Sequence, residues 1–235
     1  TALLRETGFI KSRADEGKYI DAIANAKSHL LDPESPEFQQ ILPDDDSWPE
    51  VYQTYQMSLQ RNQMVDFEDL LRLPVKLFQD HPEILETYQQ QYQWISVDEY
   101  QDINYTQYRL LQLLTVPGTN LCVIGDPDQA IYGFRGADRS FFLRFTEDFP
   151  DSRTIYLTRN YRSTGMILNA STQVIARGAE SQPIDMWTDV VSSTRLEIFK
   201  AQTYKAEAEY VVHQIEKMVG GTGFFSLDSG RVASG

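Results

Sequence analysis

The spacing of apolar residues in the first part of the chain is that of helices. One stripe at helical intervals consists of Ile20, Ile23, Ala24, Lys27, Leu30 and Leu31. A second group follows an acidic loop and consists of Val51, Tyr52, Tyr55 and Leu59. Residues 1–62 are therefore predicted to form a helical segment.

The next stretch also predicts helices, with a proline inside the first. Asp66 is a plausible N-cap. The apolar face expected after it consists of Phe67, Leu70, Leu71 and Leu77. Pro74 is expected to kink or break this helix, because proline lacks the amide hydrogen that a helix uses. Another helix is predicted to begin at His81–Pro82.

From residue 94 the pattern alternates between short apolar runs and helical stretches. The apolar runs predict buried strands at residues 94–97, 121–124 and 154–157. The helical patterns lie at residues 105–114, 141–149 and 164–176, the last with Ser163 as its expected cap. Strand, helix, strand, helix is typical of a parallel α/β sheet. Beyond a polar stretch at 178–194, where we expect a domain boundary, residues 196–199 predict a strand and 206–219 a helix.

Composition narrows the class of protein. The chain has 235 residues, of which 41% are hydrophobic, and 28 aromatic rings (13 Tyr, 12 Phe and 3 Trp), so a packed core is expected. No apolar run has the roughly 18 residues of a membrane span, and the first residues lack the layout of a signal peptide. The one cysteine, Cys122, is expected to pack as a small hydrophobe. A cytoplasmic location is predicted.

The net charge of −13 argues, taken alone, against binding to nucleic acid, which usually leaves a basic footprint. Net charge is a weak guide where binding follows one groove and the acids lie elsewhere. Some of the acidic residues are indeed clustered in short runs, such as Asp44, Asp45 and Asp46.

The first chemical motif, VDEYQD at residues 97–102, directly follows a predicted strand. Parallel α/β sheets bind ligands at the carboxyl ends of their strands. Asp98 there is suited to hold the Mg²⁺ of a nucleoside triphosphate, and Glu99 to orient and deprotonate the attacking water. The alternative is a solvated acidic turn after a strand.

The second motif, residues 123–137, follows the next predicted strand. Its Gln129 is neutral and is suited to sense a γ-phosphate through its amide. Tyr132 and Phe134 beside Arg135 suit stacking on nucleobases. The alternative for the two rings is a small satellite core beneath the loop. A metal site built on Asp126, Asp128 and Asp138 is disfavoured, because no histidine or known ligand spacing accompanies these acids.

The third motif, residues 157–164, joins the third predicted strand to a helix. Arg162 at a helix N-terminus would meet an anionic ligand with both its guanidinium group and the helix dipole. Tyr161 is suited to stack on a purine. The alternative is a surface arginine paired with a neighbouring carboxylate.

The three motifs, in this order and at these separations, resemble motifs II, III and IV of the UvrD/Rep/PcrA helicases of superfamily one. The clear likeness runs from about Val65 to Ala176. The resemblance implies an α/β fold: a partial RecA-like P-loop NTPase motor domain with a helical accessory subdomain at its N-terminus. It implies that residues 1–62 belong to that accessory (1B-like) subdomain, 63–178 to the C-terminal part of the first motor domain, and 179–235 to the start of the second.

The resemblance also implies roles. Asp98 would coordinate Mg²⁺, Glu99 would activate water, and Gln129 would couple the γ-phosphate to the DNA site. Single-stranded DNA would be contacted by Tyr132, Phe134 and Arg135, adenine by Tyr161, and the γ-phosphate by Arg162. The implied activity is ATP-dependent translocation on single-stranded DNA and unwinding at duplex junctions, 3'-to-5', in repair or replication, with ATP and Mg²⁺ as cofactors. Phe134 stands where the family usually has tryptophan, and Tyr100 replaces a common phenylalanine.

A phosphate-binding loop of the form GxxxxGK[ST] is absent from these 235 residues. The chain is therefore expected to be a segment of a longer motor and to hydrolyse ATP negligibly by itself. It is also expected to self-associate or to be less stable than an intact motor domain, since apolar strand edges would lie unpaired.

Two other classes remain open. One is a helicase-like module that binds DNA or a protein partner without catalysis. The other is a metal-dependent nuclease built on Asp98, Glu99, Asp126 and Asp128. Lysine is scarce near these acids, which disfavours the nuclease.

Overall fold

The computed structural model describes residues 4, 5, 8, 9, 12–177, 184–192 and 195–220. The chain divides into two compact units, Thr1–Thr154 and Ile155–Gly235. The three-part division expected from the sequence, into residues 1–62, 63–178 and 179–235, stays a prediction.

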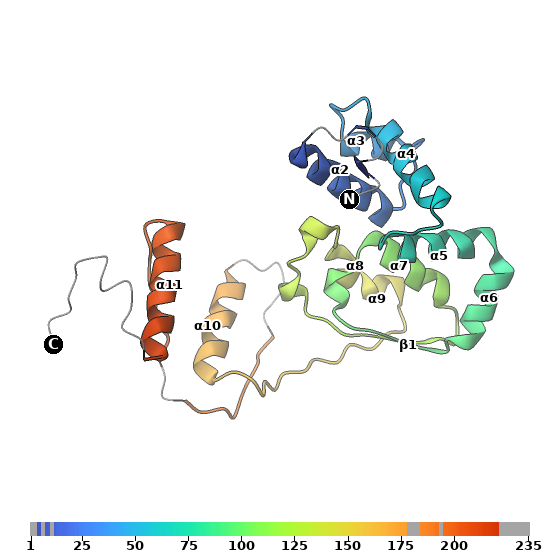
Figure 1. Ribbon diagram of the computed structural model, residues 1–235. Coiled ribbons are helices and arrows are strands. Elements are labelled where there is room, and N and C mark those ends of the chain that lie inside the picture. Colours follow the sequence, from blue (N-terminus) through green and yellow to red (C-terminus); the bar gives the residue numbers. More distant parts are fainter. Residues whose placement is uncertain (1–3, 6–7, 10–11, 178–183, 193–194, 221–235) are drawn as a thin grey trace. The chain divides into compact units, whose positions relative to one another are not determined.

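The first unit opens with a group of helices, α2 (Arg13–Ser28), α3 (Pro36–Ile41) and α4 (Trp48–Arg61) (Figure 1). Serine side chains cap the first two helices, because Ser12 and Ser35 each accept a hydrogen bond from a backbone N–H of the first turn. Their shared core consists of Leu4, Tyr19, Ala22, Ile23, Ala26, Phe38, Trp48, Val51, Tyr52, Tyr55 and Leu59. The helical character predicted for this part of the chain is confirmed.

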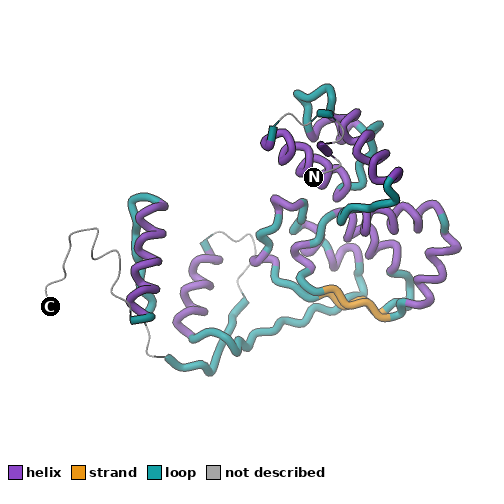
Figure 2. Tube along the Cα trace, in the orientation of Figure 1, coloured by secondary structure: helices purple, strands orange, loops and turns teal. Residues whose placement is uncertain are grey.

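A second group of helices covers a small sheet in the same unit. The helices are α5 (Asp69–Asp80), α6 (Pro82–Gln91) and α7 (Tyr105–Leu114), which contact one another. The strands are β1 (Trp94–Val97) and β2 (Asn120–Val123), which pair in parallel with Trp94 opposite Asn120 and Val97 opposite Val123. Figure 2 shows these strands together at one side of the helices. The predicted parallel α/β arrangement is confirmed for these two strands.

Short helical turns follow the two strands. They are the 3₁₀ turns η1 (Tyr100–Asp102), η2 (Pro127–Gln129) and η3 (Gly133–Arg135), and the helices α8 (Ser140–Leu143) and α9 (Phe145–Asp148). A second core cluster forms beneath them, built on Tyr100, Ile103, Tyr108 and Phe141. The single helix expected at 141–149 is thus two short helices, with a break at Arg144.

The second unit contains α10 (Gly165–Ala176) and α11 (Tyr204–Met218). A bridge of parallel type joins Arg159 to Trp187. The strands expected at 154–157 and 196–199 do not form. Their apolar side chains are exposed, with Leu157 at 81% and Ile198 at 97%. A strand needs a paired neighbour, and in the described part of this unit only the bridge at Trp187 supplies one.

The prediction of which side chains of α5 are buried is also wrong. Phe67, which precedes the helix, is exposed, as are Leu70 and Leu77, and Leu71 is half-buried. Val75 and Phe78 are buried instead. The helix turns this way because Asp69, which is buried, pairs with the ammonium group of Lys27. The helix also continues through Pro74 without breaking.

Two smaller expectations are corrected. Cys122 is exposed, because side chains alternate along β2 and the helices cover only the face that carries Leu121 and Val123. The N-cap of α10 is Thr164 instead of Ser163.

Candidate functional site

The first two motifs leave the same edge of the sheet. β1 ends at Val97 and β2 at Val123, and these two residues are register partners. The pairing extends beyond the strands: Ile124 donates its N–H to the carbonyl oxygen of Val97 at 2.8 Å, and Tyr100 donates to the carbonyl of Ile124 at 2.9 Å. The loops after the two strands are therefore held side by side by backbone hydrogen bonds.

The adjacent carboxylates Asp98 and Glu99 of the first motif are exposed at the start of this edge. Glu99 has a left-handed backbone with φ of 51°, and its N–H donates to Asp98 Oδ1 at 2.9 Å. A left-handed conformation costs a residue other than glycine roughly 1–2 kcal/mol. Such local strain tends to occur where a side chain has a functional position to hold. Asp98 and Glu99 lie adjacent, as the sequence requires, at the carboxyl end of a parallel strand.

Gln101, to which sequence analysis gave no role, links the two loops. Its side chain is buried at 1% exposure within η1. Its Nε2 donates to Glu99 Oε2 at 2.7 Å, and its Oε1 accepts from the backbone N–H of Asp126 at 3.0 Å. The partners lie 25 residues apart along the chain, so no local sequence pattern could have indicated this contact.

Gln129 is fixed by the residue that begins its own turn. Its Nε2 donates to Asp126 Oδ2 at 2.7 Å, while Asp126 Oδ1 accepts from the N–H of Asp128 at 3.0 Å. Asp126 therefore serves as the cap of η2. The side chain of Gln129 remains exposed.

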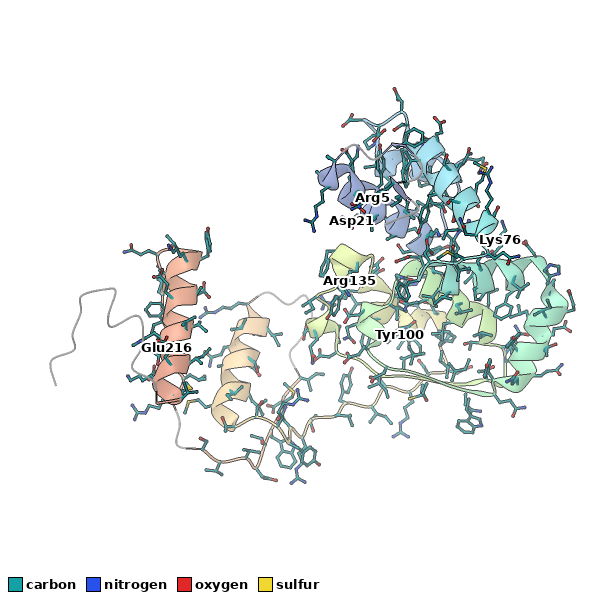
Figure 3. The ribbon with its side chains drawn as sticks, viewed as in Figure 1. Arg5, Asp21, Lys76, Tyr100, Arg135 and Glu216 are labelled. Atoms are coloured by element: carbon teal, nitrogen blue, oxygen red, sulfur yellow. The ribbon has the colours of Figure 1, made fainter. Side chains whose placement is uncertain are left out.

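The aromatic residues of the second motif form a compact group with Arg135, whose side chain is labelled in Figure 3. The rings of Tyr132 and Phe134 have centroids 5.9 Å apart, and the guanidinium carbon of Arg135 lies 5.5 Å and 5.6 Å from them. Phe134 is 80% exposed and Tyr132 is 40% exposed, so these rings do not fill a satellite core. A cation beside exposed rings suits stacking on bases next to phosphates.

The aromatic loop, which carries Tyr132, Phe134 and Arg135, lies against the C-terminal end of α2. Gly136 has a φ of 83°, a conformation that favours glycine. A Cβ at this position would lie 3.0 Å from the hydroxyl oxygen of Ser28 and 3.7 Å from the ring of His29. This close approach fixes where the loop turns after Arg135.

Tyr100, also labelled in Figure 3, is the residue of the first motif that lies in the second core cluster. Its ring packs against Phe142 and Phe145, with centroids 6.1 Å and 5.5 Å away. Burial raises the pKa of Tyr100 to about 12. Its hydroxyl has no hydrogen-bond partner among the described residues, so the aromatic ring is the part of this side chain that the fold uses.

The third motif lies in the second unit. Asn160 Oδ1 accepts from the N–H groups of Arg162 at 2.9 Å and Ser163 at 2.7 Å, which shapes the turn before α10. The Arg159 guanidinium lies 4.8 Å from the ring centroid of Tyr161 and 5.0 Å from that of Trp187. Tyr161 is 75% exposed, and Arg162 is exposed three residues before α10 begins.

The side chains that could bind a metal ion are carboxylates at the edge of the sheet. Within the described residues, no group of three or more His, Cys, Asp or Glu side chains could hold a metal ion by itself. A site built wholly from protein ligands, as the nuclease hypothesis needs, has no support in this part of the chain. Mg²⁺ in nucleotide sites is typically held by one or two carboxylates together with substrate phosphates, and an exposed Asp98 fits that mode.

None of the helices in the described part of the chain has the length and apolar character that a membrane crossing needs.

The fold and the loops define an α/β protein with acidic, amide and aromatic side chains at the carboxyl edge of a small parallel sheet. Comparison with protein families identifies it further. Residues 3–150 match the UvrD/REP helicase N-terminal domain, and residues 155–227 match the UvrD-like helicase C-terminal domain. The chain belongs to the UvrD/REP helicase family.

Individual relatives of the chain are helicases as well. The chain is 42% identical over 215 residues to an ATP-dependent DNA helicase PcrA of Staphylococcus epidermidis, and 40% identical over 215 residues to one of Staphylococcus aureus. Each comparison covers 92% of this chain and 30% of the relative. The chain thus spans about a third of the length of these relatives.

Proposed function

We propose that the chain is the part of an ATP-dependent DNA helicase that joins the hydrolytic loop to the DNA-binding loop. The observation that carries the proposal is the pairing of the loops after β1 and β2, which brings Glu99 and Gln129 into one hydrogen-bonded arrangement. The family membership supports the same activity for the whole gene product. RecA-like architecture, the three-part domain division, 3'-to-5' polarity and a place in repair or replication belong to this proposal.

The residues of the first unit have separate roles in hydrolysis, in sensing the nucleotide and in binding DNA. Glu99 accepts a proton from the water that attacks the γ-phosphate and holds that water in line. Gln129 donates a hydrogen bond from its amide nitrogen to the γ-phosphate when that group is present and loses the bond when it is absent, and so reports the nucleotide state to the loop that continues to Tyr132. Phe134 and Tyr132 stack on bases of single-stranded DNA while Arg135 offsets the charge of the phosphates.

In the second unit, Tyr161 provides a face for adenine and Arg162 a guanidinium for the γ-phosphate. Asp98 would hold Mg²⁺, which when bound would supply positive charge to offset that of the phosphates. The 235 residues alone are expected to hydrolyse ATP negligibly, because they contain no phosphate-binding loop of the form GxxxxGK[ST].

A second candidate is a DNA-binding module without catalysis. The observation that favours it is that Tyr132, Phe134 and Arg135 contact one another within one unit, on a single loop. This candidate predicts DNA binding that is unaffected by ATP.

The test is steady-state ATP hydrolysis by the whole gene product, with and without single-stranded DNA. We expect DNA to stimulate turnover, and Glu99→Gln to lower kcat by about 100-fold or more, in the range that general-base catalysis contributes. The matched control is Glu86→Gln, which changes an exposed glutamate on α6. Turnover that is absent from the wild type, or unchanged in Glu99→Gln, would favour the binding module.

A further inference from the structure

Gln101 uses both ends of its amide although its side chain is almost fully buried. Nε2 donates to Glu99 Oε2 at 2.7 Å and, more weakly, to Asp102 Oδ2 at 3.4 Å. Oε1 accepts from the N–H of Asp126 at 3.0 Å. Buried polar groups are normally satisfied in this way, but here one partner is an exposed carboxylate whose position matters for chemistry.

The second loop is shaped to reach this amide. A Cβ at Gly125 would lie 2.4 Å from Gln101 Oε1 and 2.9 Å from the ring of Phe142. Both distances are too short for any side chain, so a glycine is needed for the backbone to settle against the amide. The close approach of residues 125 and 126 to Gln101 therefore depends on the glycine at position 125.

The hydrogen bonds continue beyond Gln101 without a break. Asp126 donates its backbone N–H to Gln101 and accepts from Gln129 Nε2 at 2.7 Å through Oδ2. Glu99, Gln101, Asp126 and Gln129 thus form one chain of contacts across the two loops. It runs from the acid of the first motif to the amide of the second.

We propose that Gln101 is a positioning residue that holds the Glu99 carboxylate in a fixed relation to the loop carrying Gln129. This inference rests on the proposed function, since it assigns Gln101 a role in the same hydrolytic site. In this role Gln101 touches neither the nucleotide nor the attacking water. It acts through Glu99, by tying the orientation of that side chain to the backbone at Asp126.

The chemistry explains why an amide stands here. The position needs one donor, for the carboxylate, and one acceptor, for the backbone N–H, on a side chain of this length. Methionine has similar reach and supplies neither a strong donor nor a strong acceptor. Asparagine keeps both groups but is one methylene shorter, so it cannot span from Glu99 to Asp126.

A purely structural role for Gln101 is the competing explanation, because the amide also satisfies the buried N–H of Asp126. The two explanations differ in how Gln101 and Glu99 combine. A residue that acts only through Glu99 has nothing left to lose when the carboxylate is gone. A structural residue lowers activity whether or not the carboxylate is present.

The experiment measures DNA-stimulated ATP hydrolysis by the whole gene product as wild type, Gln101→Met, Glu99→Gln and the double variant. We expect Gln101→Met to lower kcat roughly 10- to 100-fold, as misplacement of a reacting group by about 1 Å does. The KM for ATP should stay within about threefold. In the Glu99→Gln background, Gln101→Met should change the residual kcat by less than twofold.

The matched control is Gln53→Met, which changes an exposed glutamine on α4 and should leave kcat unchanged. If Gln101→Met lacks a cooperative unfolding transition, Gln101→Asn takes its place with the same expectations. A kcat within twofold of wild type in a folded Gln101 variant would overturn the inference, as would a further loss in the Glu99→Gln background. Wild-type protein without DNA-stimulated hydrolysis, or unaffected by Glu99→Gln, would instead refute the proposed function.

Discussion

The ammonium group of Lys27 lies 2.9 Å from the carboxylate of Asp69, and the side chains of both residues are buried. Lys27 also pairs with Asp66, whose Oδ2 accepts from the hydroxyl of Tyr55 as well. Lys27 belongs to α2 and Asp69 to α5, so this ion pair joins the N-terminal helices to the helices that cover the sheet. Both carboxylates pair with this one buried ammonium group, and Asp69 also lies 3.9 Å from Arg72 Nη1.

Removing that cation is predicted to destabilise the first unit strongly. Lys27→Met removes the ammonium group that the two carboxylates share, and breaking a buried ion pair in this way costs about 3–5 kcal/mol. Urea unfolding followed by circular dichroism measures the change. The control is Lys76→Met, at an exposed position on α5, with an expected change within about 0.5 kcal/mol. A Lys27→Met protein as stable as the control would show that the pair contributes little.

The acidic loop before α4 is predicted to make stability depend on pH. Lys18 donates to Asp45 at 2.6 Å, and Ser47 and Tyr19 donate to it as well. These contacts, that of Lys18 first, hold the pKa of Asp45 well below its usual range. The carboxylate of an unfolded chain titrates near about 3.9. The stabilisation is therefore present above that pH and is lost as the pH falls through it toward the lower folded value.

We expect Asp45→Asn to unfold at lower urea than the wild type at about pH 6, with the gap narrowing at about pH 3 as the wild type loses the same interaction. Asp44→Asn, at the exposed neighbouring position, should leave the pH dependence of unfolding unchanged. A gap between Asp45→Asn and the wild type that stays constant over this pH range would refute the assignment.

Phe134 is predicted to contribute directly to affinity for single-stranded DNA. Stacking on one base is worth roughly 1–3 kcal/mol, so Phe134→Ala should weaken binding about 5- to 150-fold. Phe134→Trp should bind at least as tightly as the wild type, since it enlarges the stacking face. Fluorescence anisotropy of a labelled oligonucleotide, with the 235-residue chain, measures this.

The control is Phe67→Ala, which removes a ring that is 86% exposed and lies outside the aromatic loop. Equal losses in Phe67→Ala and Phe134→Ala would mean that binding follows exposed apolar area in general and not this loop.

Cys122 is predicted to react in the folded chain. It is the single cysteine of the sequence and is exposed on β2. A thiol reagent such as Ellman's should therefore release close to one equivalent of chromophore without denaturant. Cys122→Ser provides the blank. Reaction only after unfolding would mean that another segment or a second copy covers this face of the strand.

The sequence predicted best those elements whose signals are local. The helix α7 is an example, because Asn104 and Gln107 form a capping box within four residues of each other. β1 and β2 were also predicted, since short apolar runs bounded by polar loops mark them. The predictions of strands at 154–157 and 196–199 were wrong, because an apolar run forms a strand only where a neighbouring strand can pair with it.

In the candidate site, too, the features with local sequence signals were predicted and the contacts between distant residues were not. The sequence placed Glu99 and Gln129 after successive strands, and the structure adds the contacts that connect them. Gln101 and Asp126 carry that connection, and their hydrogen bond joins residues 25 positions apart. No periodicity or local motif reveals such a contact. The positions of Tyr161 and Arg162 in a nucleotide site stay a prediction.

The most direct test of the account is strand displacement by the whole gene product on a labelled duplex with a single-stranded 3' tail. The wild type is predicted to displace the strand only when ATP and Mg²⁺ are present. Glu99→Gln should retain affinity for the tail and displace nothing. Displacement that proceeds equally well in Glu99→Gln, or in the wild type without ATP, would contradict the account.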